Sequence, residues 1–267
     1  EVRFEAPQIT PESTATKPSE VYKPGATLDR TLEYGGKTVP IYRDRPLKVF
    51  SDVDFIWTGE ENENQRRLEY LGGEFRTRSG FDVSSFQGEI DWDAVADDNI
   101  DFAMVRVGFR GTGTGSLNTD KYYEQNIRGA MRAGLETGVY FFAQAVTVEE
   151  AIEEADYVIS LLDGLDINGP VAYDWEMHDS TYRVYGTSPE MATACAVAFC
   201  ERIKDAGYTP MVYGGTYVTY MKYDQGALAD YLSWYPEYKS EKSEKLCPTL
   251  VYHMDYWQFS SRRAVAG

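Results

Sequence analysis

Positive charge is scarce in this sequence: 26 lysine and arginine residues face 43 aspartate and glutamate residues, for a formal net charge of −17. Nucleic-acid binding requires a basic face, so this balance argues against a nucleic-acid partner, and it also predicts weak attraction to anionic polymers. No run of about 18 apolar residues occurs, so we expect no transmembrane segment. The first residues, EVRFEAPQIT, lack the basic start and apolar stretch of a signal peptide.

Cysteine and histidine are also rare. The three cysteines, an odd number without framework spacing, do not indicate a disulfide scaffold. Cys195 and Cys200 fall in an apolar helical stretch and are expected to be small core residues. Because His178 and His253 are the only histidines, a zinc site would need carboxylates for most of its ligands. We therefore expect no metal and no cofactor.

The 267 residues, 43% of them hydrophobic, suffice for one full-sized barrel or for two small domains. Residues 1–30 are rich in Pro, Thr, Ser and Glu, which predicts a flexible linker. Residues 31–78 contain a Gly-Gly turn between short β-type runs, LEYGGKTVPIYRD, which predicts a small β-rich N-terminal extension. The remaining residues, 79–267, have a more regular pattern.

From residue 80, predicted strands alternate with predicted helices, which indicates parallel βαβ units. Five such units are followed by strands with little helix between them, which favours a barrel over its rival, an open doubly wound sheet. No phosphate-binding loop is indicated, because GFRGTGTGS (108–116) lacks the lysine of a P-loop. The predicted strands are 80–86, 102–109, 138–145, 169–176, 209–215, 231–238 and 249–261.

The strand GPVAYDWE ends in two carboxylates, Asp174 and Glu176. Residues i and i+2 of a strand share a face, roughly 6.5–7 Å apart at Cα, so Trp175 points the other way. In a barrel of parallel strands such ends form the functional face. Two neighbouring carboxylates repel, and one pKa should rise so that one group keeps its proton. From this pattern alone, the start of a solvated loop is an equally good interpretation.

Other predicted strands carry acids and aromatic residues that strengthen the case for a site. Sugar rings stack on aromatic faces, and carboxylates perform the proton transfers of glycoside hydrolysis, so this combination suits a carbohydrate. The residues concerned are Asp82, Tyr140, Trp234 and Asp255, the last flanked by Trp257 and Gln258.

Several motifs occur in an order that resembles glycoside hydrolase family 25, the lysozyme-type muramidases. The resemblance covers about residues 79–267 and is carried by SGFDVSSFQGEIDW, FAMVRVGF, GVYFFAQA, PVAYDWE, GYTPMVYGG and DYWQFSS. It implies an α/β fold, a flattened TIM-like (β/α)5β3 barrel with a small N-terminal β appendage. It also implies cleavage of the β-1,4 bond between N-acetylmuramic acid and N-acetylglucosamine in peptidoglycan.

The resemblance also implies roles for individual residues. Glu176 matches the proton donor, Asp174 the second catalytic carboxylate, Asp82 an acid that holds the others in register, and Asp255 an acid near the W-Q motif. We expect these four acids to converge in one pocket, with Glu176 holding a proton at neutral pH. For Arg106, pairing with these acids and a structural salt bridge both remain open. The substrate-binding candidates are Tyr140, Trp234, Trp257, Gln258 and Arg106.

The family pattern continues after a V-x-G motif with a final strand that carries a further acid. Since the sequence ends at Gly267, we expect that strand and one site residue to be missing. The spacing of the acids leaves three mechanisms open: a covalent nucleophile, an inverting water, or attack by the substrate's own acetamide with Asp174 stabilising it. The third is favoured because the substrate carries that group.

The sequence therefore predicts a secreted bacterial lysozyme, acting as a monomer on peptidoglycan glycan strands outside the cell or at its surface. One alternative is a non-catalytic cell-wall-binding module, against which the intact acids argue. The other is a chitinase-like N-acetylglucosaminidase. Enzymes of that group carry a longer D-x-x-D-x-D-x-E pattern, and here Val171 and Tyr173 occupy positions that would need acids or small residues.

Overall fold

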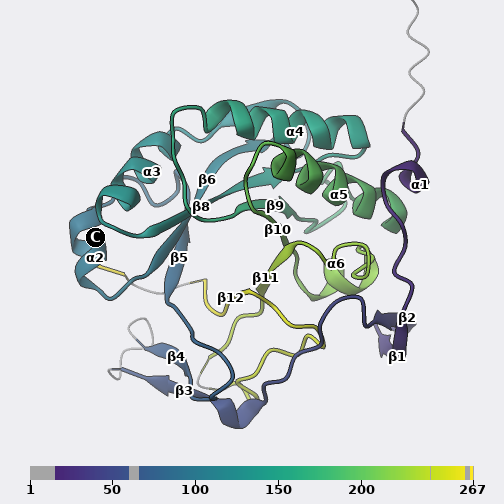
Figure 1. The fold of residues 1–267 in the computed structure, drawn as a ribbon, viewed down its shortest axis with the longest axis horizontal. Helices are drawn as coiled ribbons and strands as arrows, with labels where there is room; N and C mark the ends of the chain where they lie inside the picture. The colour runs from purple at the N-terminus through teal and green to yellow at the C-terminus, as the bar shows by residue number, and fades with distance from the viewer. Residues whose placement is uncertain (1–15, 60–65, 241, 262–264, 267) are drawn as a thin grey trace, which may run out of the picture.

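A single sheet of mainly parallel strands organises the protein. The computed structural model describes residues 16–59, 66–240, 242–261 and 265–266. The strands follow the order β12-β11-β10-β9-β8-β6-β5 and curve into a nearly closed barrel (Figure 1), with β7 antiparallel to β6. The predicted TIM-like barrel is confirmed. Its strands are β5 (Gly80–Val83), β6 (Phe102–Arg110), β7 (Leu117–Thr119), β8 (Glu136–Ala143), β9 (Val171–Trp175), β10 (Pro210–Tyr213), β11 (Leu232–Pro236) and β12 (Tyr256–Gln258).

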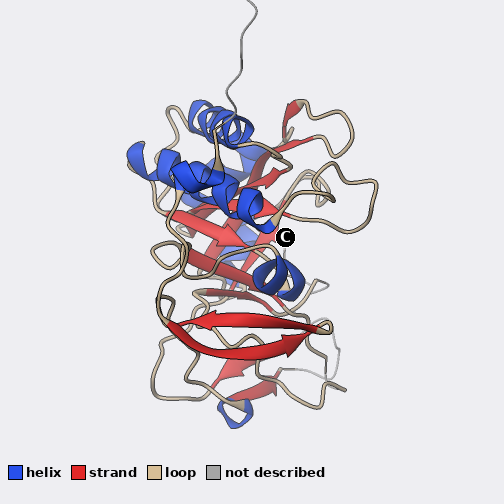
Figure 2. Ribbon diagram, turned by 90° about the vertical axis from the view of Figure 1, so that its right-hand side faces the viewer, coloured by secondary structure: helices blue, strands red, loops and turns tan. Residues whose placement is uncertain are grey.

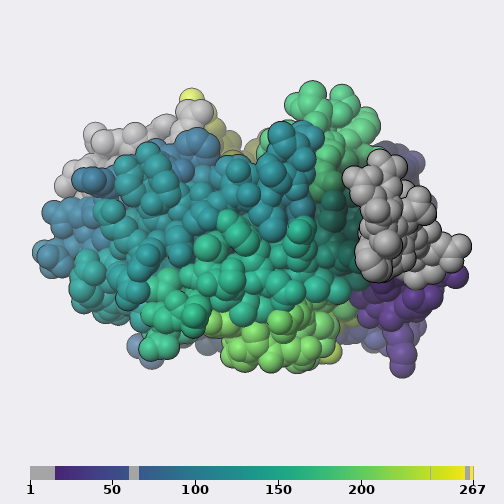
Figure 3. All heavy atoms as spheres, turned by 90° about the horizontal axis from the view of Figure 1, so that it is seen from above, coloured from purple at the N-terminus to yellow at the C-terminus, as the bar shows by residue number. Residues whose placement is uncertain are grey.

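Five helices lie between these strands and give five βα units, as the alternation predicted. Two of them begin at side-chain caps: the hydroxyl of Thr147 accepts from the N–H of Glu150, and that of Ser188 from the N–H of Met191. Seen from above, the blue-green to teal part of the chain, which includes α3 and α4, forms much of this face of the molecule (Figure 3). The helices are α2 (Trp92–Asp97), α3 (Tyr123–Arg132), α4 (Val148–Leu161), α5 (Pro189–Asp205) and α6 (Thr216–Met221).

Alternation along the strands divides the core into two layers. On β9, Val171, Tyr173 and Trp175 belong to the large cluster shared with the helices, whereas Ala172 belongs to the small cluster inside the barrel. Asp174 therefore continues the inward row. The inward cluster consists of Met104, Ala172, Met211, Tyr213 and Trp234, with Phe102, Tyr140, Leu232 and Tyr256 packed against it.

Residues 28–70 form two hairpins, the first around the Gly-Gly turn noted in the sequence, and they lie at the side of the barrel opposite α3 and α4 (Figures 1 and 2). In the first, Gly35 and Gly36 both have positive φ, 57° and 74°, as a two-residue hairpin turn requires. The strands are β1 (Leu28–Tyr34) paired with β2 (Lys37–Tyr42), and β3 (Phe55–Thr58) paired with β4 (Arg67–Tyr70); a short helix, α1 (Pro18–Val21), precedes them, and a 3-10 turn, η1 (Asp52–Asp54), precedes β3.

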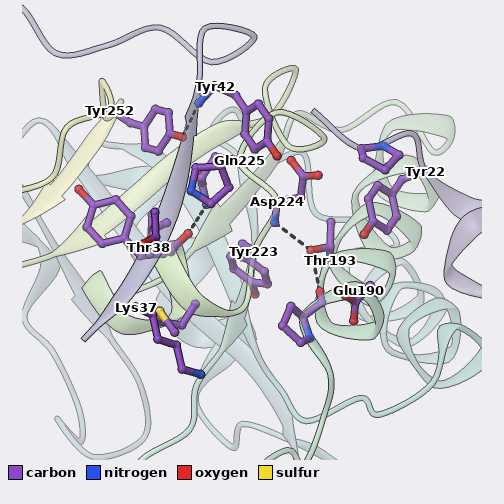
Figure 4. Close-up of a pocket in the computed structure, with 17 residues that line it drawn as sticks. Tyr22, Lys37, Thr38, Tyr42, Glu190, Thr193, Tyr223, Asp224, Gln225 and Tyr252 are labelled. Atoms are coloured by element: carbon purple, nitrogen blue, oxygen red, sulfur yellow. Dashed lines mark hydrogen bonds between the residues drawn. The ribbon is translucent and has the colours of Figure 1, made fainter. Parts of the chain in front are cut away.

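The extension is joined to the barrel by buried polar contacts. Arg45, only 5% exposed, donates from its guanidinium to the carbonyl oxygens of Leu228 and Tyr231, at 3.0 and 3.3 Å. The N–H of Gly25 donates to the carboxylate of Asp224 at 2.9 Å. A pocket of about 350 Å³ lies along this junction, between the first hairpin and the start of α5 (Figure 4).

Two boundaries predicted from the sequence need correction. The linker predicted for residues 1–30 ends too late: residues 1–15 lie outside the described residues, but the N–H of Thr16 already bonds Glu149 and the side chain of Tyr22 packs on the core. The strand predicted for residues 249–261 is confined to β12, and Tyr252 before it makes only an isolated bridge to Leu47. The division into extension and barrel domains stays a prediction. Among the described residues, no helix is long and apolar enough to span a membrane.

Candidate active site

Asp174 and Glu176 lie at the carboxyl end of β9, as the D-x-E pattern predicted. Asp174 is 6% exposed, on the inward row of the strand. Trp175 points outward, and its indole N–H donates to the carbonyl oxygen of Ala145 at 3.2 Å. Glu176 is the first residue after the strand and keeps 23% of its side chain exposed. The deeper carboxyl group is therefore Asp174, and the more accessible one is Glu176.

The two carboxyl groups are electrostatically coupled. Burial raises the pKa of Asp174 well above its usual range, and the charge of Glu176, a hydrogen bond between the two side chains and the charge of Asp82 raise it further. The sequence predicted that Glu176 would hold the proton that such a pair retains. In the structure Asp174 is the more deeply buried of the two carboxyl groups, and this burial raises its pKa.

Asp82, near the end of β5, is the third acid of this cluster. Its Oδ2 accepts a 2.7 Å hydrogen bond from Nε2 of Gln258 on β12. Burial raises the pKa of Asp82, the bond from Gln258 lowers it, and the charge of Glu176 raises it. Asp82, Asp174 and Glu176 thus lie close enough to influence one another, as expected for a common site.

Aromatic side chains line the space beside these acids. Tyr140 packs edge-on against Trp234, with ring centroids 5.8 Å apart, and Trp234 packs in the same way on Tyr213 at 5.0 Å. Burial raises the pKa of Tyr140, and the neighbouring charges of Asp82 and Asp174 add to the effect. A cavity of about 520 Å³ opens beside Asp82, with Trp234, Tyr238 and Gln258 also in its wall. Its size and lining suit a sugar ring.

Arg106 makes the structural salt bridge that the sequence analysis left open. Its guanidinium bonds the buried carboxylate of Asp120 at 2.8–2.9 Å and the hydroxyl of Ser85 at 3.2 Å. Phe86 and Phe109 lie against it, with centroids 5.0 and 5.4 Å from Cζ. Arg106 still acts on the acids at longer range, since its charge lowers the pKa of Asp174.

The expectation that Asp255 joins the other acids is wrong. Asp255 precedes the first residue of β12, at the amino end of the strand, and alternation directs it away from the side of Tyr256 and Gln258. Its Oδ2 accepts from the N–H and the hydroxyl of Ser233, at 2.8 and 3.1 Å. It is therefore a structural acid on the outer face of the barrel.

Trp257 makes contacts on both sides of β12, and its predicted role in substrate binding stays a prediction. By the same alternation it faces the extension, where its ring packs edge-on against Phe55 at 5.4 Å and its indole N–H donates to the carbonyl oxygen of Glu237. Trp257 also lies in the wall of the cavity beside Asp82. It therefore joins β12 to the second hairpin as well as lining that cavity.

Two neighbours of the acids were not predicted from the sequence. His178 Nε2 lies 2.6 Å from Oε2 of Glu176; it follows Glu176 by two residues, so extending the alternation of the D-x-E pattern would have found it. Tyr238 donates to Oε1 of Gln258 at 3.1 Å and orients that amide toward Asp82. Among the described residues, no group of three or more His, Cys, Asp and Glu side chains is arranged to hold a metal ion.

Comparison with known proteins adds to this geometry. The family model described as "Glycosyl hydrolases family 25" matches residues 81–267. A curated relative, the autolytic lysozyme of Clostridium acetobutylicum, is 25% identical over 164 residues, which are 61% of this chain and 46% of that protein. The chain thus spans about half the length of the curated relative that it matches.

Solved structures show the same fold. The modular autolysin LytC from Streptococcus pneumoniae superposes with a TM-score of 0.58 and 22% identity, over 86% of this chain and 54% of that one. The bacterial lysozyme from Streptomyces coelicolor superposes with a TM-score of 0.55 and 24% identity, over 70% of this chain and 86% of that one. With the family model matched over most of its length, the chain belongs to glycosyl hydrolases family 25.

Proposed function

We propose that this chain is a secreted muramidase that hydrolyses the β-1,4 bond between N-acetylmuramic acid and N-acetylglucosamine in peptidoglycan. The geometry that carries the proposal is the pair of Asp174 and Glu176 at the carboxyl end of β9, together with Asp82, which adjoins both acids and lies in the wall of a cavity with aromatic residues. Membership of family 25 and the likeness to an autolytic lysozyme support the substrate class. The site of action is then outside the cell or at its surface.

In the proposed reaction, Glu176 protonates the glycosidic oxygen, because it is the more accessible of the two carboxyl groups. The pair retains one proton, which reaches Glu176 through its hydrogen bond to Asp174. The oxygen of the substrate's acetamide group attacks the anomeric carbon as the bond to the leaving sugar breaks. Asp174, now a carboxylate, accepts the acetamide N–H and stabilises the positive charge that develops on that group.

A water molecule then completes the hydrolysis. Glu176, which lost its proton to the leaving oxygen, accepts a proton from this water as the water oxygen attacks the anomeric carbon. The acetamide is released unchanged, and the sugar retains its configuration. Asp82 and Tyr140 adjoin Asp174 and are proposed to keep its carboxyl group oriented through both steps.

Incubation with purified peptidoglycan and mass analysis of the fragments tests the proposal. Muramidase action leaves new reducing ends on muramic acid. Reducing ends on glucosamine would assign the other glycosidic bond, as a chitinase-like enzyme would cleave it. Binding to the polymer without any soluble fragment would favour a non-catalytic wall-binding module.

A further inference from the structure

The main chain of Glu176 is held by a residue from the neighbouring strand connection. Nε2 of Gln144 donates a 2.9 Å hydrogen bond to the carbonyl oxygen of Glu176. Gln144 follows β8, and its side chain reaches across to the residue that follows β9. The bond therefore fixes the peptide that carries the accessible carboxyl group of the candidate site.

Gln144 is itself held rigidly. It is fully buried, its N–H donates to Oε1 of Glu154 at 3.0 Å, and its carbonyl oxygen accepts from the guanidinium of Arg183 at 2.9 Å. The next carbonyl, of Ala145, accepts from the indole N–H of Trp175, the residue before Glu176. Two consecutive residues after β8, Gln144 and Ala145, thus bond the two consecutive residues at the end of β9, Glu176 and Trp175.

Ion pairs behind Gln144 support this arrangement. Glu154 accepts from Nε of Arg110 at 2.7 Å, and Glu150, one turn earlier on α4, binds Arg183 through both oxygens at 2.7 and 3.0 Å. Glu150 also accepts from the N–H of Val146 at 2.9 Å. Residues i and i+4 of a helix share a face, so α4 directs both acids at the connection that begins with Gln144.

We propose that Gln144 is a positioning residue, which holds Glu176 at the distance from Asp174 that the reaction requires. The proposal rests on the catalytic role proposed for Glu176. A misplacement of about 1 Å can cost roughly 10²-fold in rate. A single bond to a fully buried amide is well suited to prevent such a displacement.

Two substitutions test the proposal. Gln144→Met keeps the length of the side chain and removes the donor. Gln144→Glu restores a donor only when the new carboxyl group is protonated, because its O–H then takes the place of Nε2. Oε1 of Gln144 has no hydrogen-bond partner in the described part of the chain, so neither substitution breaks a hydrogen bond to this oxygen.

A matched control exists at the junction with the extension. Gln225 is also buried, 8% exposed, and its Nε2 donates to the carbonyl oxygen of Thr219 at 3.2 Å (Figure 4). Gln225→Met therefore removes one buried amide-to-carbonyl bond of the same kind far along the chain from Glu176. A purely structural role for Gln144 would make the two methionine variants alike.

On peptidoglycan that the wild-type protein cleaves, we expect Gln144→Met to lower kcat by roughly 10–100-fold with KM within about threefold, as misplacement of a reacting group does. Gln225→Met should keep kcat near the wild-type value. Equal kcat values for the two variants would overturn the proposal. A wild-type protein that releases no fragments would refute the proposed function instead.

The pH dependence separates positioning from packing. The titratable and charged groups that face Gln144 and Glu176 are Glu150 and Glu154 from α4, Arg110 from β6, Arg183 from the connection after β9, Asp82 from β5, and Asp174 and His178 beside Glu176. Both Gln144 variants carry these same groups, so the kcat ratio of Gln144→Glu to Gln144→Met reports on the introduced carboxyl group. The ratio should rise as the pH falls; a flat ratio would contradict the proposal.

A measurement without substrate completes the test. The pKa of Asp174 is raised in part by its contact with Glu176, so displacement of Glu176 should lower it. Carboxyl 13C NMR should show Asp174 titrating at lower pH in Gln144→Met and unchanged in Gln225→Met. Identical titrations in all three proteins would overturn the positioning role even if the wild-type protein cleaves no peptidoglycan.

Discussion

Nε2 of Gln258 donates a 2.7 Å hydrogen bond to Oδ2 of Asp82 and thereby links β12 to β5, the two edge strands of the barrel sheet. Oε1 of the same amide accepts from the hydroxyl groups of Tyr238 and Tyr213, at 3.1 and 3.4 Å. An amide that accepts on one side must present its N–H groups on the other. One side chain thus closes the sheet edge and orients an acid of the candidate site.

Gln258→Met should alter the pH profile of activity. The bond from Gln258 lowers the pKa of Asp82, so its loss should raise that pKa, and Asp82 should ionise at higher pH. If the reaction needs Asp82 ionised, the acidic limb of kcat/KM moves to higher pH. A profile that coincides with that of the wild-type protein would show that Asp82 acts in another way.

Glu176→Gln should abolish most of the activity and leave the fold intact. The amide is nearly isosteric but cannot protonate the leaving oxygen, and loss of a general acid costs roughly 10²–10⁴-fold in rate. Glu124→Gln, on the surface of α3, is the control. Turnover of peptidoglycan by Glu176→Gln at the wild-type rate would remove Glu176 from the mechanism.

Asp174→Asn should stabilise the protein at neutral pH while it inactivates it. Folding raises the pKa of Asp174 above its unfolded value, near 3.8. Such a group stabilises the folded protein fully below the unfolded pKa, and this stabilisation is lost as the pH rises through the folded pKa. The amide carries no charge to desolvate. We therefore expect a higher Tm than wild type at pH 7, and a gain that shrinks toward pH 4.

The exposed Asp163→Asn is the control for that comparison, because its side chain lies on the surface after α4. This substitution should leave the difference in Tm between pH 4 and pH 7 the same as in the wild-type protein. A Tm for Asp174→Asn below that of wild type at pH 7 would mean that the carboxylate is stabilised by its surroundings, contrary to its burial.

Glu154→Gln should flatten the pH dependence of stability. Burial raises the pKa of Glu154 from 4.5 to about 7, more than the bonds from Arg110 and Gln144 lower it. Between pH 4.5 and about 7 the folded protein therefore binds more protons than the unfolded protein. Up to about 3 kcal/mol of the free energy of unfolding is lost as the pH rises through 7. Urea unfolding at pH 5–8 should show this slope in wild type and in the partly exposed Glu153→Gln, but not in Glu154→Gln.

Salt should affect the rate on intact cell walls more than the rate on short uncharged fragments. The net charge of −17 opposes approach to an anionic wall, and the Debye length falls to about 10 Å at 0.1 M salt, which weakens that repulsion. Moderate salt should therefore raise the rate on walls. Equal slowing on both substrates would indicate that a basic patch guides the polymer to the site.

Local patterns in the sequence predicted much of the fold and part of the site. Strand–helix alternation predicted the parallel barrel, and the D-x-E pattern predicted that Trp175 points away from Asp174. Each of these signals lies within a few residues of the feature that it predicts. Such signals need no knowledge of how distant segments pack.

The errors arose where distant segments decide the outcome. A 13-residue strand was predicted around Asp255, but only three residues pair with β11, and the preceding ones pack against the extension. Asp120, the partner of Arg106, lies beyond β7, 14 residues further along the chain. Gln144, the partner of Glu176, lies in a connection whose contact crosses to the next βα unit. Hydrophobic periodicity carries no information about such contacts.

The buried contacts around Arg45 determine which recombinant fragments of this protein we expect to be soluble. A fragment that starts at residue 81, where the family match begins, would keep Asp82, Asp174 and Glu176. It would also lose Ile41, which covers Tyr235, Leu250, Tyr252 and Met254. An apolar surface of that kind promotes aggregation. A soluble recombinant version therefore needs both hairpins and the Gly25 contact to Asp224, so its first residue should lie before Gly25.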